Sequence, residues 1–206
     1  MTEYWGPYYW YFLHTISKSY PEHPTQLDKK LYSELFLLFI KLLPCKSCQA
    51  HFIAITKAHP AKMNNRDEWE HWVVKIHNKV NMRLKKPKIS YDAYMTMYQT
   101  IDHEILYKFI NYVQKRAYMN HIPFSQFIYL LNLLVLLYPC LECRRSYQYR
   151  YKKDNLPQLM LSRVNLEHWL KTYIKPKEYH IKFNKLKLKV KKHKKKHKNK
   201  NKPKLY

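Results

Sequence analysis

Residues 35–48 read LFLLFIKLLPCKSC, an apolar run that ends in proline and leads into a C-x-x-C motif. The spacing of the apolar positions predicts a helix that ends near Leu43, and a second helix is predicted to begin at Cys45. Two cysteines on one first helical turn lie within disulfide reach, and a helix N-terminus stabilises a thiolate there. The stretch therefore indicates a helical protein with a redox-capable cysteine pair.

The same pattern occurs a second time. Residues 133–143 read LLVLLYPCLEC, so Cys140 lies 95 positions after Cys45 (140 − 45), and the two pairs hold the chain's only cysteines. The triplet Glu-His-Trp also recurs, at 70–72 and 167–169, with a shift of two residues. Coincidence between two leucine-rich helices is the alternative, but the shared order of motifs predicts two copies of one bundle.

Composition favours an all-α protein. The 206 residues can form one ordinary domain or two small ones, and the 46% hydrophobic content is enough for real cores. A single glycine excludes a glycine-rich phosphate loop and a Rossmann fingerprint. A bound nucleotide would therefore be held in some other way.

Positive charge is concentrated at the C-terminus. The chain carries a net charge of +25, and residues 177–206 contribute fourteen lysines against one glutamate. Such a self-repelling run cannot bury a core, so we expect residues 177–206 to form a disordered tail. It is either a solubilising segment or a source of weak attraction to nucleic acid or to an anionic membrane face.

The sequence also predicts where the protein works. Its first residues lack the pattern of a secretory signal, and no apolar stretch reaches membrane-spanning length. We therefore expect an intracellular protein. Because structural disulfides are rare in that compartment, the C-x-x-C pairs point to redox chemistry or to a metal.

Helix signals divide the first hundred residues. The predicted helices cover residues 10–20, 26–43, 45–58 and 65–84, with Asn65 as the N-cap of the fourth, and a short fifth helix begins at Ser90 or Tyr91. The sequence therefore predicts a bundle of four helices plus a short fifth.

A polar motif, HNKVNMRLKKP, occupies residues 77–87. On a helix, His77 and Asn81 share one face, which by itself is more typical of a satisfied buried network than of a cofactor site. Together with three other blocks, however, the motif makes residues 4–99 resemble the Erv/ALR family of FAD-linked sulfhydryl oxidases. These blocks are Trp10-x-x-Leu13-His14, Tyr20-Pro21-x-x-Pro24 and Leu43-Pro44-Cys45-x-x-Cys48.

The resemblance implies a helical bundle that binds FAD beside the C-x-x-C motif. Carried over by motif position, the implied flavin contacts are Gly6, Trp10, His14, Tyr20, Cys48, His77, Asn78, Val80, Asn81 and Lys86. The types of these side chains fit FAD, because flat rings stack on adenine, amides and imidazoles bind ribose and flavin edges, and a lysine neutralises pyrophosphate. Three positions depart from the pattern of cellular members: Pro7, Lys85 and Tyr98.

The resemblance also implies an enzyme that oxidises thiols. A thiolate of a dithiol or thioredoxin-like protein substrate would attack the disulfide at Cys45, and Cys48 would pass two electrons to FAD and then to O2, giving hydrogen peroxide. The opening Trp5-Gly6-Pro7 looks most like short members from large DNA viruses of eukaryotes, which would place the protein in the host cytoplasm or the virion.

The second copy lacks the flavin motifs. Ile105 and Phe109 stand near the slots of the tryptophan and the histidine at an offset of 95, and residues 174–175 stand near the His77-Asn78 slot at an offset of 97. We therefore expect no second FAD. The predicted domains are residues 1–101, an Erv/ALR-like FAD domain, and residues 102–176, a degenerate Erv-like bundle. We expect either an intramolecular pseudo-dimer, in which the degenerate bundle replaces the partner, or a homodimer. The roles open to Cys140 and Cys143 are a relay disulfide or a structural one.

Two other classes of protein remain as alternatives. A zinc-binding nucleic-acid module would use both C-x-x-C pairs as four thiolate ligands, but zinc ribbons place their pairs about 15 to 20 residues apart, far closer than in this chain. A noncatalytic scaffold of the same fold would keep the bundle without turnover. The leading prediction needs no metal.

Overall fold

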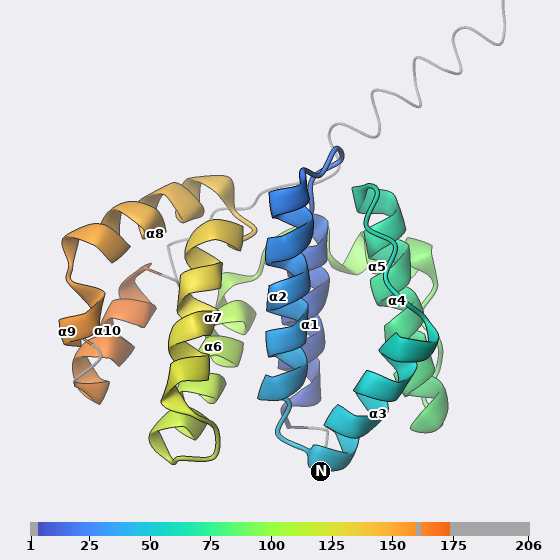
Figure 1. Ribbon diagram of the computed structural model, residues 1–206, viewed down its shortest axis with the longest axis horizontal. Helices are drawn as coiled ribbons and strands as arrows, with labels where there is room; N and C mark the ends of the chain where they lie inside the picture. Colours follow the sequence, from blue (N-terminus) through green and yellow to red (C-terminus); the bar gives the residue numbers. More distant parts are fainter. Residues whose placement is uncertain (1–3, 160–161, 174–206) are drawn as a thin grey trace, which may run out of the picture.

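The computed structural model describes residues 4–159 and 162–173 of the chain, and these residues form helices without any strand (Figure 1). The all-helical prediction is therefore confirmed for this part of the chain. The helices are α1 Gly6–Lys18, α2 Gln26–Leu42, α3 Lys46–Ala58, α4 Arg66–Arg83, α5 Tyr91–Met97, α6 His103–Tyr118, α7 Phe124–Leu137, α8 Leu141–Lys153, α9 Leu156–Leu159 and α10 Arg163–Tyr173.

The first helices begin at local capping signals. Thr25 forms a capping box with Asp28, because each side chain accepts a hydrogen bond from the other residue's backbone N–H. The side chains of Asn65 and Ser90 cap α4 and α5 in a similar way, and the sulfur of Cys45 caps α3. The predicted starts of these helices are thus confirmed, and each rests on one residue that satisfies a free backbone N–H.

Two groups of helices lie side by side. Figure 1 shows α1 to α5 on one side and α6 to α10 on the other, and we call them the N-terminal and C-terminal halves. They meet where α1 packs on α6 and α2 packs on α7. Phe12 of α1 stacks on Phe109 of α6 with ring centroids 4.0 Å apart, and one hydrophobic cluster spans both halves. The halves therefore share a core.

The bounds of the helices repeat between the halves. The helices α3 and α8 begin 95 positions apart (141 − 46), whereas α1 and α6 begin 97 apart (103 − 6), as do α4 and α10 (163 − 66). The turns around the two cysteine pairs also match. Gln49 Nε2 donates to the carbonyl of Leu43, and Arg144 Nε donates to the carbonyl of Tyr138, both at 2.8 Å.

This spacing corrects the alignment of the second copy. Because α6 begins 97 positions after α1, Ile105 and Phe109 do not occupy the slots of the first half's tryptophan and histidine. Phe109 is instead the counterpart of Phe12, on which it stacks, and the two slots fall on Tyr107 and Asn111. The expected residues 174–175 of the third slot lie outside the described residues.

Two further expectations are left as predictions. The division at residues 101 and 102 falls in the short link before α6, and the lysine-rich residues 177–206 lie outside the described part of the chain. None of the helices within residues 4–159 and 162–173 combines the length and the apolar character needed to cross a membrane.

Candidate active site

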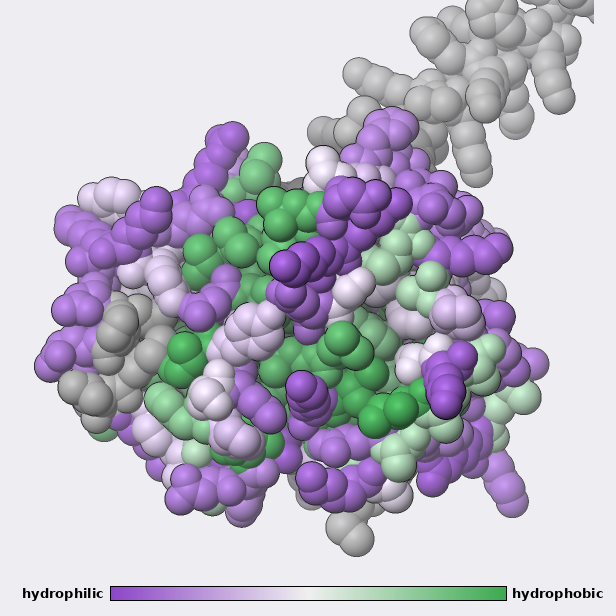
Figure 2. All heavy atoms as spheres, in the orientation of Figure 1, coloured by the Kyte–Doolittle hydropathy of each residue, from purple (hydrophilic) through white to green (hydrophobic). Residues whose placement is uncertain are grey.

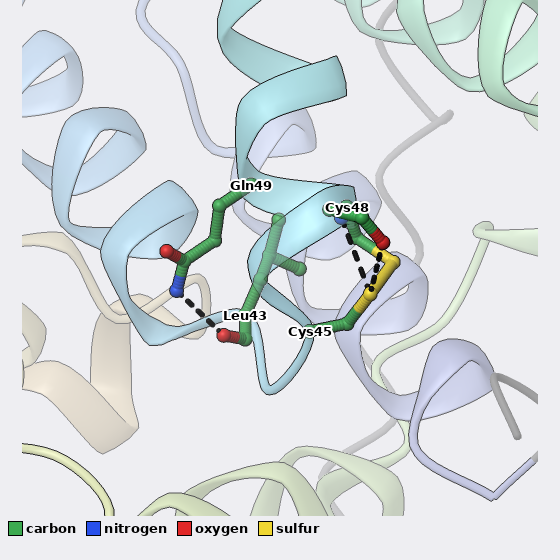
Figure 3. Close-up of a disulfide and its surroundings, with 5 residues drawn as sticks. Leu43, Cys45, Cys48 and Gln49 are labelled. Atoms are coloured by element: carbon green, nitrogen blue, oxygen red, sulfur yellow. Dashed lines mark hydrogen bonds between the residues drawn. A yellow bond between two sulfur atoms is a disulfide. The ribbon is translucent and has the colours of Figure 1, made fainter.

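The first C-x-x-C pair is a disulfide at the start of α3. Cys45 is the N-cap residue, and its sulfur accepts the backbone N–H of Cys48 at 3.2 Å (Figure 3). The hydroxyl of Ser47 lies 3.2 Å from the same sulfur. The site thus places hydrogen-bond donors and the positive end of a helix around Cys45, which stabilises a thiolate when the disulfide opens.

A side-chain amide fixes the turn that carries this disulfide. Gln49 Nε2 donates to the carbonyls of Leu43 at 2.8 Å and of Lys41 at 3.0 Å. In Figure 3 the amide of Gln49 lies on one side of the first turn of α3 and the disulfide lies on the other. These hydrogen bonds connect the C-terminal end of α2 to the first turn of α3, so both helices fix the position of the disulfide.

A large cavity opens beside the disulfide. Its volume is about 930 Å³, and its walls come mainly from α1, α3, α4 and the segment after α4, with single residues from α2, α5 and α6. Both Cys45 and Cys48 line it. Seven of the ten implied flavin contacts line it as well: Gly6, Trp10, Cys48, His77, Val80, Asn81 and Lys86.

Stacked rings form one wall of the cavity. The indole of Trp10 lies parallel to the imidazole of His77, with centroids 3.7 Å apart. Nε2 of His14 lies 2.7 Å from Nδ1 of His77, behind the wall. Burial lowers the pKa of His77 to about 4, with a smaller effect from Lys86, and burial also holds the pKa of His14 well below its usual value. Both imidazoles are therefore neutral at pH 7.

The remaining implied contacts lie outside the cavity wall. Tyr20 is buried and its hydroxyl donates to the carbonyl of Met63 at 2.9 Å. Asn78 forms two hydrogen bonds with the backbone of Ile89, one as donor and one as acceptor. Together with His14, these residues support the elements around the cavity. Their assignment as flavin contacts stays a prediction.

The segment after α4 turns sharply at Lys85. This residue has a φ of 55°, in the left-handed region, and the next N–H, that of Lys86, donates to the carbonyl of Asn81 at 2.8 Å. The amide of Asn81 in turn donates to the carbonyl of Pro87 at 2.9 Å. The turn thereby brings Lys86 and Pro87 into the wall of the cavity.

Sequence reasoning missed several lining residues, and His51 is the most informative of them. Its Nε2 atom is buried without a hydrogen-bond partner among the described residues. Burial lowers the pKa of His51, and the positive charge of Arg83 lowers it further. His51 and Arg83 both line the cavity. The signal was present, because His51 follows Cys48 by three positions and so shares its face of α3.

The residues present fit a flavin nucleotide. The cavity falls in the size range of small-molecule sites, about 300–1,000 Å³, and its walls are mostly apolar with a few polar groups. Trp10 offers a flat surface for stacking, Lys86 offers a positive charge for phosphate, and the buried Nε2 of His51 lacks a partner. A redox disulfide in the same wall supplies the electrons that a flavin accepts.

The second cysteine pair is in a different environment. Cys140 and Cys143 form a disulfide, and they are only 0% and 6% exposed. Within the described residues, the group with metal-ligand spacing joins this pair to His103 and does not include Cys45 or Cys48. A four-thiolate zinc site therefore has no support from the structure.

Comparison with known proteins finds relatives of the N-terminal half of the chain. Residues 7–101 match the model of the Erv1 / Alr family. Over 95 residues the chain is 34% identical to the FAD-linked sulfhydryl oxidase of African swine fever virus, covering 46% of this chain and 80% of the relative. Over 77 residues it is 39% identical to FAD-linked sulfhydryl oxidase ERV1 of Arabidopsis thaliana, covering 37% of this chain but only 40% of the relative. The crystal structure of the yeast Erv1 core is 28% identical, with a TM-score of 0.46, and the match covers 48% of this chain and 84% of that one.

A helical bundle with a C-x-x-C disulfide in the wall of a flavin-sized cavity defines a class of redox proteins. The chain belongs to the Erv1/Alr family, as its resemblance predicted.

Proposed function

We propose that the chain is an FAD-linked thiol oxidase that forms disulfides in other proteins. The observation that carries this proposal is the position of the Cys45–Cys48 disulfide, which lines a flavin-sized cavity at a helix N-terminus. The names of the plant and viral relatives, FAD-linked sulfhydryl oxidase, support the activity. The overall reaction converts two thiols and O2 into one disulfide and hydrogen peroxide.

The reaction begins with thiol–disulfide exchange at Cys45. A substrate thiolate attacks the sulfur of Cys45 and forms a mixed disulfide, and the electron pair of the broken bond stays on the sulfur of Cys48. A second substrate thiolate then attacks the substrate sulfur of the mixed disulfide. The substrate leaves with its new disulfide, and Cys45 leaves as a thiolate that the N-terminus of α3 stabilises.

The reduced pair is then oxidised again inside the cavity. FAD, when bound, accepts the two electrons of the dithiol and transfers them to O2. The chain holds both sulfurs in the cavity wall, and the parallel rings of Trp10 and His77 keep that wall flat. The neutral imidazoles of His14 and His77 add no charge to the wall of the cavity that would hold the flavin nucleotide. Lys86 would hold the pyrophosphate, since no glycine loop exists.

We further propose that the C-terminal half takes the place of a dimer partner. It covers α1 and α2 with α6 and α7, and the stack of Phe12 on Phe109 lies at this contact. The substrate would be a dithiol or thioredoxin-like protein, and the host cytoplasm or the virion would be the site of action, as the viral relatives suggest.

An absorption spectrum and an oxygen electrode test the proposal. The purified chain should be yellow, and with dithiothreitol it should consume O2 and release hydrogen peroxide. Cys48→Ala should retain flavin and lose turnover, because the mixed disulfide at Cys45 could no longer form from an internal disulfide. A folded chain that stays colourless after incubation with FAD would contradict the proposal.

A further inference from the structure

A groove follows the contact between α2 and α7. Its first part is a hollow of about 430 Å³ between the two helices, bordered by Glu34, Leu37 and Tyr129. Leu37 and Tyr129 are 58% and 40% exposed, so this hollow presents apolar surface to solvent. Figure 2 shows apolar atoms gathered over the middle of this face, with hydrophilic side chains around them.

The groove continues toward the redox disulfide. A second hollow, of about 370 Å³, is bordered by Pro44, Lys46 and Arg116, and both hollows share Lys41 and Gln126 as lining residues. The two hollows therefore form one channel on the surface, built by both halves of the chain. We call it the seam groove.

The seam groove ends at the turn that carries Cys45, on the side opposite the flavin cavity. Pro44 and Lys46, which flank Cys45 in sequence, border the groove, whereas Cys45 itself lines the flavin cavity. Gln49 also borders the groove, and in Figure 3 its amide lies on the other side of the α3 turn from the disulfide. The turn is thus a thin wall between the two spaces.

The charge of the seam groove is positive near the disulfide. The ammonium groups of Lys41 and Lys46 are exposed, and the guanidinium of Arg116 borders the same hollow, where it donates to the carbonyl of Leu42. Glu34, at the far end, accepts a hydrogen bond from Tyr129 at 2.7 Å. Three cationic side chains thus border the hollow that ends at the Cys45 turn, and no carboxylate of the described residues lines that hollow.

We propose that the seam groove binds an acidic, extended segment of the substrate protein, the segment that flanks the thiol attacking Cys45. Carboxylates of the segment lie against Lys41, Lys46 and Arg116, and an apolar side chain lies against Leu37 and Tyr129. This proposal rests on the proposed oxidase activity and names the chemistry of its protein substrate. Charge complementarity of this kind speeds encounter and selects among partners.

Peptide binding tests the seam groove apart from catalysis. The acidic probe is a labelled peptide with Ser-Ala-Ala-Ser followed by alternating aspartate and leucine, and the neutral probe has asparagine in place of each aspartate. Serines replace the cysteines, so no exchange chemistry contributes to binding. Fluorescence anisotropy with the full FAD-loaded chain measures both dissociation constants at low and at high salt.

Charge reversal at one lysine distinguishes the groove from the overall charge. Lys41→Glu alters the middle of the groove, and Lys57→Glu is the matched control, an exposed lysine near the end of α3 that borders neither hollow. We expect the acidic peptide to bind the unaltered chain at least tenfold more tightly than the neutral one at low salt. Lys41→Glu should weaken that binding by about tenfold, and Lys57→Glu by less than twofold.

Three outcomes would overturn the proposal. One is equal binding of the two peptides. Another is an equal loss with Lys41→Glu and Lys57→Glu, which would assign the attraction to the whole positive chain. The third is that a single-stranded oligonucleotide, but not the acidic peptide, loses affinity with Lys41→Glu. Turnover of dithiothreitol by the unaltered chain is measured separately, so a failure of the oxidase activity is not mistaken for a failure of the groove.

Discussion

The neutral state of His77 predicts that the folded chain loses stability in mild acid. The hydrogen bond between Nε2 of His14 and Nδ1 of His77 needs one nitrogen without a proton, so the pair cannot keep it when both rings are charged. The pKa of His77 is about 4 in the folded chain, against about 6.5 unfolded. Between these values the unfolded chain binds more protons, so stability falls as the pH drops from about 6.5 to about 4.

The size of this effect follows from the shift. A difference of about 2.5 pH units corresponds to at most about 3 kcal/mol, and about 2 kcal/mol is lost by pH 5. Urea unfolding of the flavin-free chain at pH 7, 6 and 5 measures it. His77→Asn removes the titrating group, so its stability should vary less with pH by about that amount, whereas His23→Asn, on an exposed loop, should follow the unaltered chain. Parallel pH profiles for His77→Asn and the unaltered chain would refute the reasoning.

Three further predictions concern single residues. Lys85→Gly should raise the free energy of unfolding by about 1 kcal/mol, since glycine adopts a φ of 55° without strain; a loss of stability in urea would contradict this. Phe109→Ala should lower the free energy of unfolding by about 3–5 kcal/mol, because the side chain is fully buried between the halves, whereas Leu136→Ala on the surface should change it little. His51→Ala should weaken FAD retention by about tenfold with little loss of stability, as fluorescence titration would show; unchanged FAD affinity would exclude a contact.

The helix starts could be predicted because their causes are local. Asn65 and Ser90 each cap a helix by accepting one backbone N–H three residues on, and such a signal is complete within four residues. The C-x-x-C disulfide is local in the same sense. The cavity wall could be predicted in part, since Trp10 and His77 belong to motifs in the chain.

The sequence did not predict two kinds of feature: the alignment of the second copy, which depends on helix lengths, and contacts between residues far apart in the chain. A constant offset placed Phe109 in the slot of His14, because α7 has 14 residues where α2 has 17, and motif spacing before Cys140 does not show this. Tyr20 lies outside the cavity wall, where its hydroxyl donates to the carbonyl of Met63, an interaction across 43 positions that no local pattern encodes, and its flavin contact stays a prediction. His51 was missed because it lies outside the four motif blocks, although its position three residues after Cys48 places it on the same face of α3.

The shared core restricts how the two halves can diverge through evolution. In the C-terminal half, Phe109 is buried against Phe12 and Tyr9, so substitutions there act on the half that carries the flavin cavity. Tyr107 and Asn111 occupy the slots that hold Trp10 and His14 in the other half, and they do not form or support the wall of the flavin cavity. Mutations should therefore accumulate on the side of the C-terminal half that faces away from the contact. The side that packs on α1 and α2 should change less, because substitutions there also destabilise the N-terminal half.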